Sequence, residues 1–446
     1  MQGLSIKQLV FISFMLFSMF FGAGNLIFPP FLGYNAGENV WLALAGFIVS
    51  AVGLPILGVA AVAKAGSFQA MARRVHPSFA VLFPMLIYVS IGPGLAIPRA
   101  GSLAFEMGMG PFLPAEWSGS PVALFLYTVV FFSFVWWLSL SPSKLVDRFG
   151  KMLTPLLLAL IMVIFVKSWF SPLGAAGEPD ENYLSHPAFQ GFLDGYLTMD
   201  ALAALVFGIV VADVLRSKGV QNSSQLSRYM MAAGLGAGLL LAAIYIILGY
   251  LGASSGALPD AKNGANILTY AVHQLFGTSG ALILGLVFTL ACFCVSIGLV
   301  TSCSQYFTAV FPRISYATCV KLLCAGSMLI ANLGLTLILQ VSVPILGAIY
   351  PVAIVLIVLA LLDRSGNKSS AVHRVTVGFV ALFSVGDMIN AMFLSRAWDP
   401  FFATMPLHEK GVGWLMPALV GIVLGYGLDK WTDKRKPEEI RPAQTM

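Results

Sequence analysis

The chain has 446 residues, of which 58% are hydrophobic and only 10% charged, whereas soluble domains carry about 25% charged residues. Its net charge of +6 comes from basic residues in short loops between apolar runs, so the charge does not indicate nucleic-acid binding. The composition therefore indicates an integral membrane protein. The five cysteines lie in or near apolar segments and suggest no disulfide framework.

Twelve apolar runs follow one another along the chain, each near the ~20 residues that a membrane-spanning helix needs. They lie at 6–32, 40–63, 79–106, 121–141, 151–170, 190–213, 229–253, 280–310, 315–338, 341–362, 372–394 and 413–431. A short amphipathic piece near Asn263–Phe276 precedes the eighth run and is interpreted as a lid helix.

Lysine and arginine are distributed unevenly between the two sets of loops. Twenty of them lie in one alternate set of loops and in both tails, and three, Lys262, Arg396 and Lys410, lie in the opposite set. Because Lys and Arg collect in cytoplasmic loops, both termini are predicted to lie in the cytoplasm. Consistent alternation also supports an even number of spans.

The first run is interrupted in its middle by Gly22, Ala23, Gly24 and Asn25. Glycine costs about 1 kcal/mol in a helix interior and asparagine prefers caps and turns, so we expect two half-helices joined by an unwound link. The first half would end in free carbonyls, which suit a cation, and the second would begin with free N–H groups, which suit a carboxylate. Broken helices of this kind mark transporter sites. The alternative is a glycine kink that packs against a neighbouring helix.

The sixth run carries Thr198 and Asp200 inside its apolar stretch. Interruptions at corresponding positions of two halves point to a transporter site. Asp200 could receive a substrate ammonium, carry a proton, or cap the second half-helix, and Thr198 offers another cap. Five runs precede the acidic loop at 178–181, and because five is odd the next five would sit inverted.

These patterns predict an all-α integral membrane protein with twelve transmembrane helices, a five-plus-five inverted repeat, and broken helices one and six. The first repeat would cover 1–171 and the second 190–362, followed by two accessory helices at 371–432 and a cytoplasmic tail at 433–446.

The third run contains Tyr88, Ile91 and Gly92 near its middle. Gly92 and its neighbours would thin the helix and leave room for a ligand, with Tyr88 able to bond a carboxylate; close helix packing is the alternative. Arg99 falls toward the outer end of this run, where it would either close a gate by pairing with an acid or extend its tip to water, and the second is favoured.

The eighth run contains Cys292, Cys294, Val295 and Ser296. Hydroxyls and carbonyls there could complete a sodium shell, although back-bonding within the helix is the alternative. The two cysteines point to different helix faces and do not suggest a metal site. The chain has no GxxxxGK[ST], HExxH or GxSxG motif, so neither ATP-driven transport nor these enzyme chemistries are indicated. A channel remains open as an alternative, but no repeated filter loop is evident.

Four stretches carry a family resemblance: FFGAGNLIFPPFLG at 20–33, GFIVSAVGLPILGVAA at 46–61, IGPGLAIPRAGSLAFE at 91–106 and GYLTMDALAALVFGIVVAD at 195–213. The chain resembles the bacterial branched-chain amino acid:cation symporter family, within the amino acid–polyamine–organocation superfamily. The resemblance implies a secondary transporter of the bacterial inner membrane that is not an enzyme and has no cofactor. It further implies leucine, isoleucine and valine as substrates and sodium as coupling ion. A proton-coupled carrier using Asp200 is the alternative.

The family picture also implies a site. Backbone N–H groups of the first break would hold the substrate carboxylate, carbonyls near both breaks would face the ammonium, and apolar side chains would line the rest. The expected substrate residues are Phe20, Gly22, Ala23, Gly24, Asn25, Leu26, Tyr88, Ile91, Gly92, Thr198, Asp200 and Phe207. The expected sodium ligands are contributed by Met19, Phe20, Phe21, Asn25, Cys292, Val295 and Ser296. The family typically has a Thr-Thr pair where Cys294 and Val295 stand here, so the ion site is expected to be weakened and to rely on Ser296.

Overall fold

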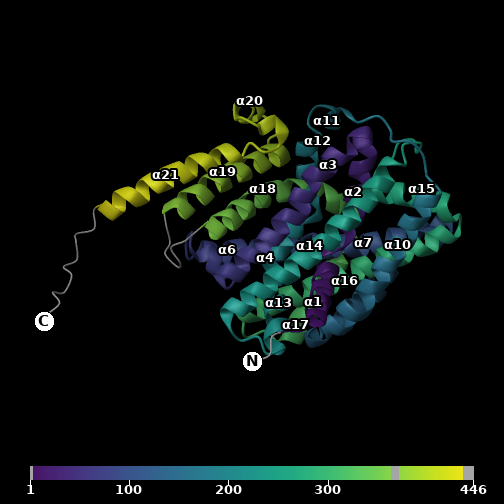
Figure 1. Ribbon diagram of the computed structural model, residues 1–446, viewed down its shortest axis with the longest axis horizontal. Coiled ribbons are helices and arrows are strands. Elements are labelled where there is room, and N and C mark those ends of the chain that lie inside the picture. Colours follow the sequence, from purple (N-terminus) through teal and green to yellow (C-terminus); the bar gives the residue numbers. More distant parts are fainter. Residues whose placement is uncertain (1–3, 363–370, 435–446) are drawn as a thin grey trace.

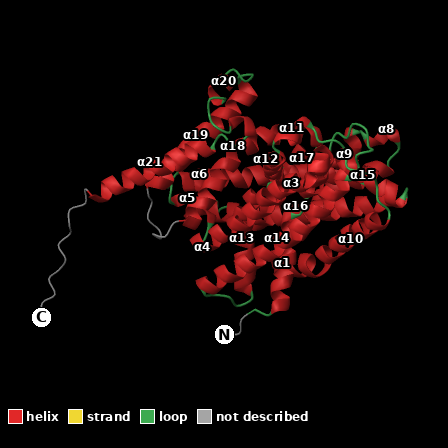
Figure 2. Cartoon of the chain, turned by 45° about the horizontal axis from the view of Figure 1, so that its top comes forward, coloured by secondary structure: helices red, strands yellow, loops and turns green. Residues whose placement is uncertain are grey.

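The computed structural model describes residues 4–362 and 371–434. Within these ranges helices joined by loops make up the chain and no strand is present (Figure 2), which confirms the all-α prediction. The loop residues Arg364 and Lys368, and the tail residues 435–446, which entered the charge count and the predicted tail, lie outside the described residues.

The first part of the chain forms five helical segments, two of which continue through a turn of π-helix, at Val49–Gly53 and Ser90–Gly94. The π-helical residues Val146–Leu153 lead into the fifth segment. The helices are α1 (Ile6–Phe20), α2 (Ala23–Ala36), α3 (Val40–Ile48), α4 (Leu54–Ala65), α6 (Phe79–Val89), α7 (Ala96–Gly108), α9 (Pro121–Ser139) and α10 (Thr154–Phe170).

The second part repeats this pattern of long helices, followed by two more at its end. They are α12 (Pro187–Asp194), α13 (Asp200–Ser217), α14 (Ser223–Ala253), α16 (Ser279–Val310), α17 (Tyr316–Ala331), α18 (Leu335–Leu362), α19 (Ala371–Phe393) and α21 (Leu415–Lys434). Shorter helices lie in the connections: α5 (Phe68–Arg73), α8 (Ala115–Ser118), α11 (Glu181–Ser185), α15 (Gly264–Phe276) and α20 (Asp399–Phe402). The segment near 263–276 that was expected to form a lid helix is helical, and the Asn263 side chain caps it. Its function as a lid stays a prediction.

Most predicted runs match these helices within a few residues. The main difference is α18, which begins at Leu335 and not near 341. Among the described residues, eight helices are long and apolar enough to cross a membrane, or nine if the bent pair Pro187–Thr198 and Asp200–Ser217 is one span. Because α1 and α17 are shorter apolar helices, the count of twelve spans stays a prediction.

The two broken helices lie in the middle of the bundle, where α1 and α13 are packed against α14 and α16 (Figure 1). In contrast, α19 and α21 lie side by side at the edge and join the rest mainly through α18. The accessory role expected for the last two helices stays a prediction.

Glycines allow backbone-to-backbone contact around α2. A Cβ atom on Gly33 would overlap the carbonyl oxygen of Gly249 in α14, and one on Gly252 would overlap that of Pro30 in α2. Small residues at helix contacts let membrane helices approach this closely. The second half of the first broken helix is therefore held against α14 at two points.

Candidate functional site

The first break separates α1 from α2 at Phe21 and Gly22, where Gly22 is extended (φ −134°, ψ −154°). The unwound link is therefore shorter than predicted, because Ala23, Gly24 and Asn25 already form the first turn of α2. The chain can take this course because the Asn25 side-chain oxygen accepts the Gly22 N–H at 3.0 Å. The helical hydrogen bonds are interrupted here, as expected for two half-helices. Gly22 also packs closely against a neighbouring helix, which the alternative of a packing kink requires as well.

Free backbone groups face this break from both halves. Among the described residues, no acceptor is found for the N–H groups of Ala23, Gly24 and Asn25, and no donor for the carbonyls of Met19 and Phe20. The N–H of Leu26 donates to the Gly22 carbonyl at 3.2 Å, so this group is not free in the structure, and substrate binding by Leu26 stays a prediction. A helix N-terminus with free N–H groups suits a carboxylate, and carbonyls suit a cation.

The second break lies between α12 and α13, which meet at an angle of 41°. Residues Gly195–Thr198 form a turn of 3₁₀-helix and Met199 takes the left-handed conformation (φ 67°). Such a conformation costs a non-glycine residue roughly 1–2 kcal/mol and tends to occur at functional sites. The Thr198 hydroxyl donates to Gly195 O at 2.9 Å and accepts the Asp200 N–H at 3.4 Å. Met199 occupies the N-cap position of α13, so the Asp200 side chain does not cap this helix.

Asp200 instead joins the two breaks. Its Oδ2 atom accepts the Asn25 side-chain amide at 2.6 Å and the Tyr245 hydroxyl at 2.8 Å, and the Asn25 amide also contacts the Tyr245 oxygen. All three side chains are at most 1% exposed. We call Asn25, Asp200 and Tyr245 the polar triangle; it links α2, α13 and α14.

The polar triangle changes the interpretation of Asn25 and adds a residue that sequence reasoning missed. Both ends of the Asn25 amide are bonded within the protein. In this conformation its side-chain oxygen therefore does not point to an ion or a substrate. Tyr245 lies in the seventh apolar run, where a lone hydroxyl carries no sequence signal about its partner.

Arg99 is the second residue that sequence reasoning misplaced. It is 3% exposed, and so the expectation that its tip reaches water is wrong. Its Nη1 donates to the Leu197 carbonyl at 2.9 Å, and its guanidinium lies 5.6 Å from the centre of the Phe28 ring. Nη2 lies 2.8 Å from the position that a Cβ on Gly24 would occupy. The guanidinium therefore stands over the free end of α2.

These groups surround one small pocket, the central pocket. Its residues come from α1, α2, the third and sixth helical segments and α16: Met19, Phe20, Gly22, Ala23, Gly24, Asn25, Ile91, Ala96, Arg99, Thr198, Met199, Asp200, Ala203, Val295 and Leu299. Its volume is ≈ 20 Å³, room for about one water molecule. On the other side of Arg99 lies a second cavity of ≈ 190 Å³, which Phe28, Leu197 and Lys262 also line.

Four expected substrate residues lie outside the central pocket: Leu26, Tyr88, Gly92 and Phe207. Tyr88 is stacked on Tyr306 with ring centres 3.8 Å apart and lines a different cavity of ≈ 370 Å³. Gly92 packs against Cys303, where a Cβ would come within 2.9 Å of the sulfur. Phe207 supports the pocket from behind, with its ring 5.3 Å from that of Phe20.

The eighth helical segment, α16, packs directly on the first break. A Cβ on Gly22 would lie 2.6 Å from Cγ1 of Val295, so glycine is needed there for this close contact. Ser296 and Cys292 are fully buried but do not line the central pocket. The Ser296 hydroxyl has no hydrogen-bond partner among the described residues, which leaves it available as an oxygen ligand.

The sequence is similar to known proteins over nearly its whole length. The family described as "Branched-chain amino acid transport protein" matches residues 5–432. The branched-chain amino acid permease BraB of Bacillus subtilis is 46% identical over 433 residues, covering 96% of both chains. The branched-chain amino acid transport system 2 carrier protein of Pseudomonas aeruginosa is 43% identical over 434 residues, covering 96% of this chain and 97% of the relative.

Solved structures show the same fold at low identity. Mhp1, a nucleobase-cation-symport-1 family transporter in a closed conformation, aligns with a TM-score of 0.64 and 13% identity over 96% of this chain and 93% of its own. MhsT in complex with L-phenylalanine aligns with a TM-score of 0.57 and 15% identity over 94% and 99%. The relatives are named permeases and carrier proteins, which are transporters and not enzymes. By sequence along its whole length, this chain belongs to the branched-chain amino acid transport protein family.

Proposed function

We propose that this protein imports leucine, isoleucine and valine across the bacterial inner membrane by symport with sodium. The observation that carries the proposal is the central pocket, where two broken helices present free N–H groups and free carbonyls to one small space. A zwitterionic amino acid needs both kinds of group, and alternating access around such a pocket is the general behaviour of broken-helix carriers. The names of the relatives support the substrate class.

The substrate carboxylate would lie at the start of α2. There the N–H groups of Gly24 and Asn25 are free, and the Arg99 guanidinium stands beside them. Arginine bonds carboxylates strongly because its donors match both oxygens. The ammonium group would face the carbonyls of Met19 and Phe20 and the carboxylate of Asp200.

The aliphatic side chain would contact the apolar part of the pocket, which Ile91, Ala96, Ala203 and Leu299 line. One methylene in such a surface is worth only about 1–3 kcal/mol, so poor discrimination among leucine, isoleucine and valine follows. Because ≈ 20 Å³ holds no leucine, the surrounding helices must separate before substrate enters.

Arg99 would act as the gate between the central pocket and the cavity beyond it. Its bond to the Leu197 carbonyl ties the third helical segment to the second break. Opening toward that cavity requires the guanidinium to leave this carbonyl. A substrate carboxylate competes for the same donors, so binding and gate closure would involve one side chain.

Sodium would bind at the end of α1. Hard cations prefer oxygen ligands, and the Met19 and Phe20 carbonyls and the unpartnered Ser296 hydroxyl are of that kind. Proton coupling is the second candidate, because Asp200 is a buried carboxylate beside the same pocket.

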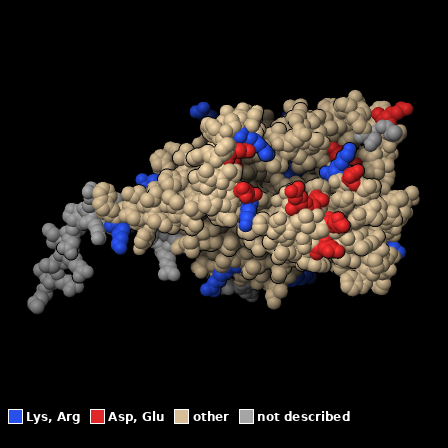
Figure 3. Space-filling model, turned by 90° about the horizontal axis from the view of Figure 1, so that it is seen from above, with Lys and Arg blue, Asp and Glu red and all other residues tan. Residues whose placement is uncertain are grey.

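In the membrane, both termini would face the cytoplasm. The excess of Lys and Arg in the loops on the side of the N-terminus supports this orientation. Figure 3 shows the opposite face, where acidic side chains gather and where α11 and α20 lie (Figure 1). Residues 1–171 and 190–362 would form the two inverted repeats and 371–432 the accessory pair.

The test is uptake of labelled leucine into proteoliposomes under a sodium gradient and, separately, under a proton gradient. Uptake is expected with sodium alone, and unlabelled isoleucine and valine should compete. Gly24→Ala should abolish it, because the new methyl would crowd Arg99 and Leu197 O, whereas Gly326→Ala meets nothing within 4 Å and serves as control. Uptake with the proton gradient alone would favour the proton-coupled carrier, and no uptake of any of the three amino acids would refute the substrate class.

A further inference from the structure

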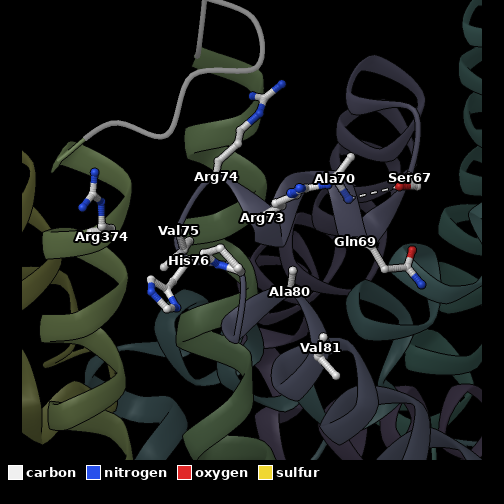
Figure 4. A pocket seen from close by; sticks show the side chains of 11 residues that line it. Ser67, Gln69, Ala70, Arg73, Arg74, Val75, His76, Ala80, Val81 and Arg374 are labelled. Atoms are coloured by element: carbon white, nitrogen blue, oxygen red, sulfur yellow. Dashed lines mark hydrogen bonds between the residues drawn. The ribbon is translucent and has the colours of Figure 1, made fainter. Parts of the chain in front are cut away.

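A large cavity lies away from the central pocket, at the connection between the second and third helical segments. Its volume is ≈ 950 Å³, against ≈ 370 Å³ for the cavity beside Tyr88. It is bounded by α5, by the turn and first residues leading into α6, and by Arg374 near the start of α19. Figure 4 shows these elements around the space. We call it the basic cavity.

The walls of the basic cavity carry one sign of charge. Among the described residues that line it, three are arginines, one is a histidine and none is acidic: the basic side chains are Arg73, Arg74, His76 and Arg374. Arg73 and Arg374 are exposed and form no ion pair with any described residue. A phosphate in the cavity could accept paired hydrogen bonds from the guanidinium groups of Arg73 and Arg374.

The basic cavity also borders the apolar outer surface of the molecule. Val81 of α6 lines it and is 55% exposed. On the same helix Leu82 and Leu86 are 69% and 45% exposed, as expected for side chains that face lipid. A ligand with a phosphate head and apolar chains would thus place the head among the arginines and the chains along α6.

We propose that the basic cavity binds the headgroup of an anionic phospholipid. Basic pockets beside membrane helices on the cytoplasmic side recognise such headgroups, and the loop at 64–78 belongs to the Lys- and Arg-rich set. The assignment to that leaflet rests on the orientation proposed above. Because α5 belongs to the first repeat and Arg374 to the accessory helices, the bound lipid would connect these two parts.

The test measures lipid binding to the purified full-length protein, first in detergent. The melting temperature is followed while phosphatidylglycerol, phosphatidylcholine or inorganic phosphate is added, and binding is then measured in vesicles with and without phosphatidylglycerol. The cavity variant is Arg73→Gln with Arg374→Gln. The matched control, Arg313→Gln with Lys321→Gln, removes the same charge from the loop before α17 and from the first part of α17.

Phosphatidylglycerol is expected to raise the melting temperature of the wild type, and phosphatidylcholine and inorganic phosphate are not. The cavity variant should bind phosphatidylglycerol at least roughly tenfold more weakly, while the control variant should bind like the wild type. Equal binding by the cavity variant, or equal loss in both variants, would overturn the site. Equal stabilisation by inorganic phosphate would overturn the lipid as the ligand. Neither the melting temperature nor lipid binding depends on leucine transport. A negative result in this experiment can therefore be told apart from a failure of the proposed transport function.

Discussion

The polar triangle offers a sharp test of how the two breaks are held together. Tyr245→Phe removes a hydroxyl that donates to Asp200 at 2.8 Å and contacts the Asn25 amide. A hydrogen bond to a charged group contributes about 1.5–3 kcal/mol in soluble proteins, whereas bonds between membrane helices average about 0.6 and reach about 1.7 kcal/mol. Because all three residues are buried and a carboxyl oxygen of Asp200 is the acceptor, we expect a loss near the upper membrane value, about 1.5 kcal/mol.

The assay is a double-mutant cycle of Tyr245→Phe with Asp200→Asn, using reversible unfolding in mixed micelles. A coupling energy of roughly 1 kcal/mol or more between the two sites is expected, since groups in one hydrogen-bond network are not additive. The control pairs Tyr245→Phe with Ser102→Ala, whose hydroxyl donates to Ala331 O at 2.7 Å in a different helix contact. That pair should be additive. Coupling below about 0.3 kcal/mol for the first pair would refute the polar triangle.

Three further changes test the gate, the ion site and the packing. Arg99→Lys keeps the charge but loses the paired donors, so the leucine concentration for half-maximal uptake should rise roughly tenfold or more; unchanged uptake kinetics would exclude Arg99 from carboxylate binding. Ser296→Ala should raise the sodium concentration for half-maximal uptake and Val295→Thr should lower it, and if neither moves it the ion does not bind at this part of α16. Gly33→Ala should lower the free energy of unfolding by about 1–3 kcal/mol, because its methyl would overlap a carbonyl of α14; a melting temperature as high as that of the wild type would show that the contact can relax.

Much of the fold could be predicted because the bilayer imposes long apolar helices. The run at 280–310 became Ser279–Val310 and the run at 40–63 became the segment from Val40 to Ala65. The start of α18 at Leu335 was missed, although residues 335–341 continue an apolar stretch. The turn at 332–334, which separates α17 from α18, was included in the ninth predicted run. The predicted start of the tenth run therefore fell several residues after the true start of α18.

The candidate site was predictable only where the backbone itself carries the signal. Gly22 and Gly24 mark the first break by their lack of side chains, and Asp200 marks the second by its charge. The partners of these residues depend on how distant helices pack, so Tyr245 and the inward direction of Arg99 could not be predicted. For the same reason Tyr88 was assigned to the substrate, although its ring lies stacked on Tyr306.

The shortness of the first break has a thermodynamic consequence. Only Phe21 and Gly22 separate the free carbonyls at the end of α1 from the free N–H groups at the start of α2. A cation held by the carbonyls fixes the same two residues whose torsions position the N–H groups for a carboxylate. Each ligand would therefore strengthen the binding of the other by an equal factor, as linkage requires. In the proposed sodium symport, these two residues would couple the ion and the amino acid without any signal crossing the rest of the protein.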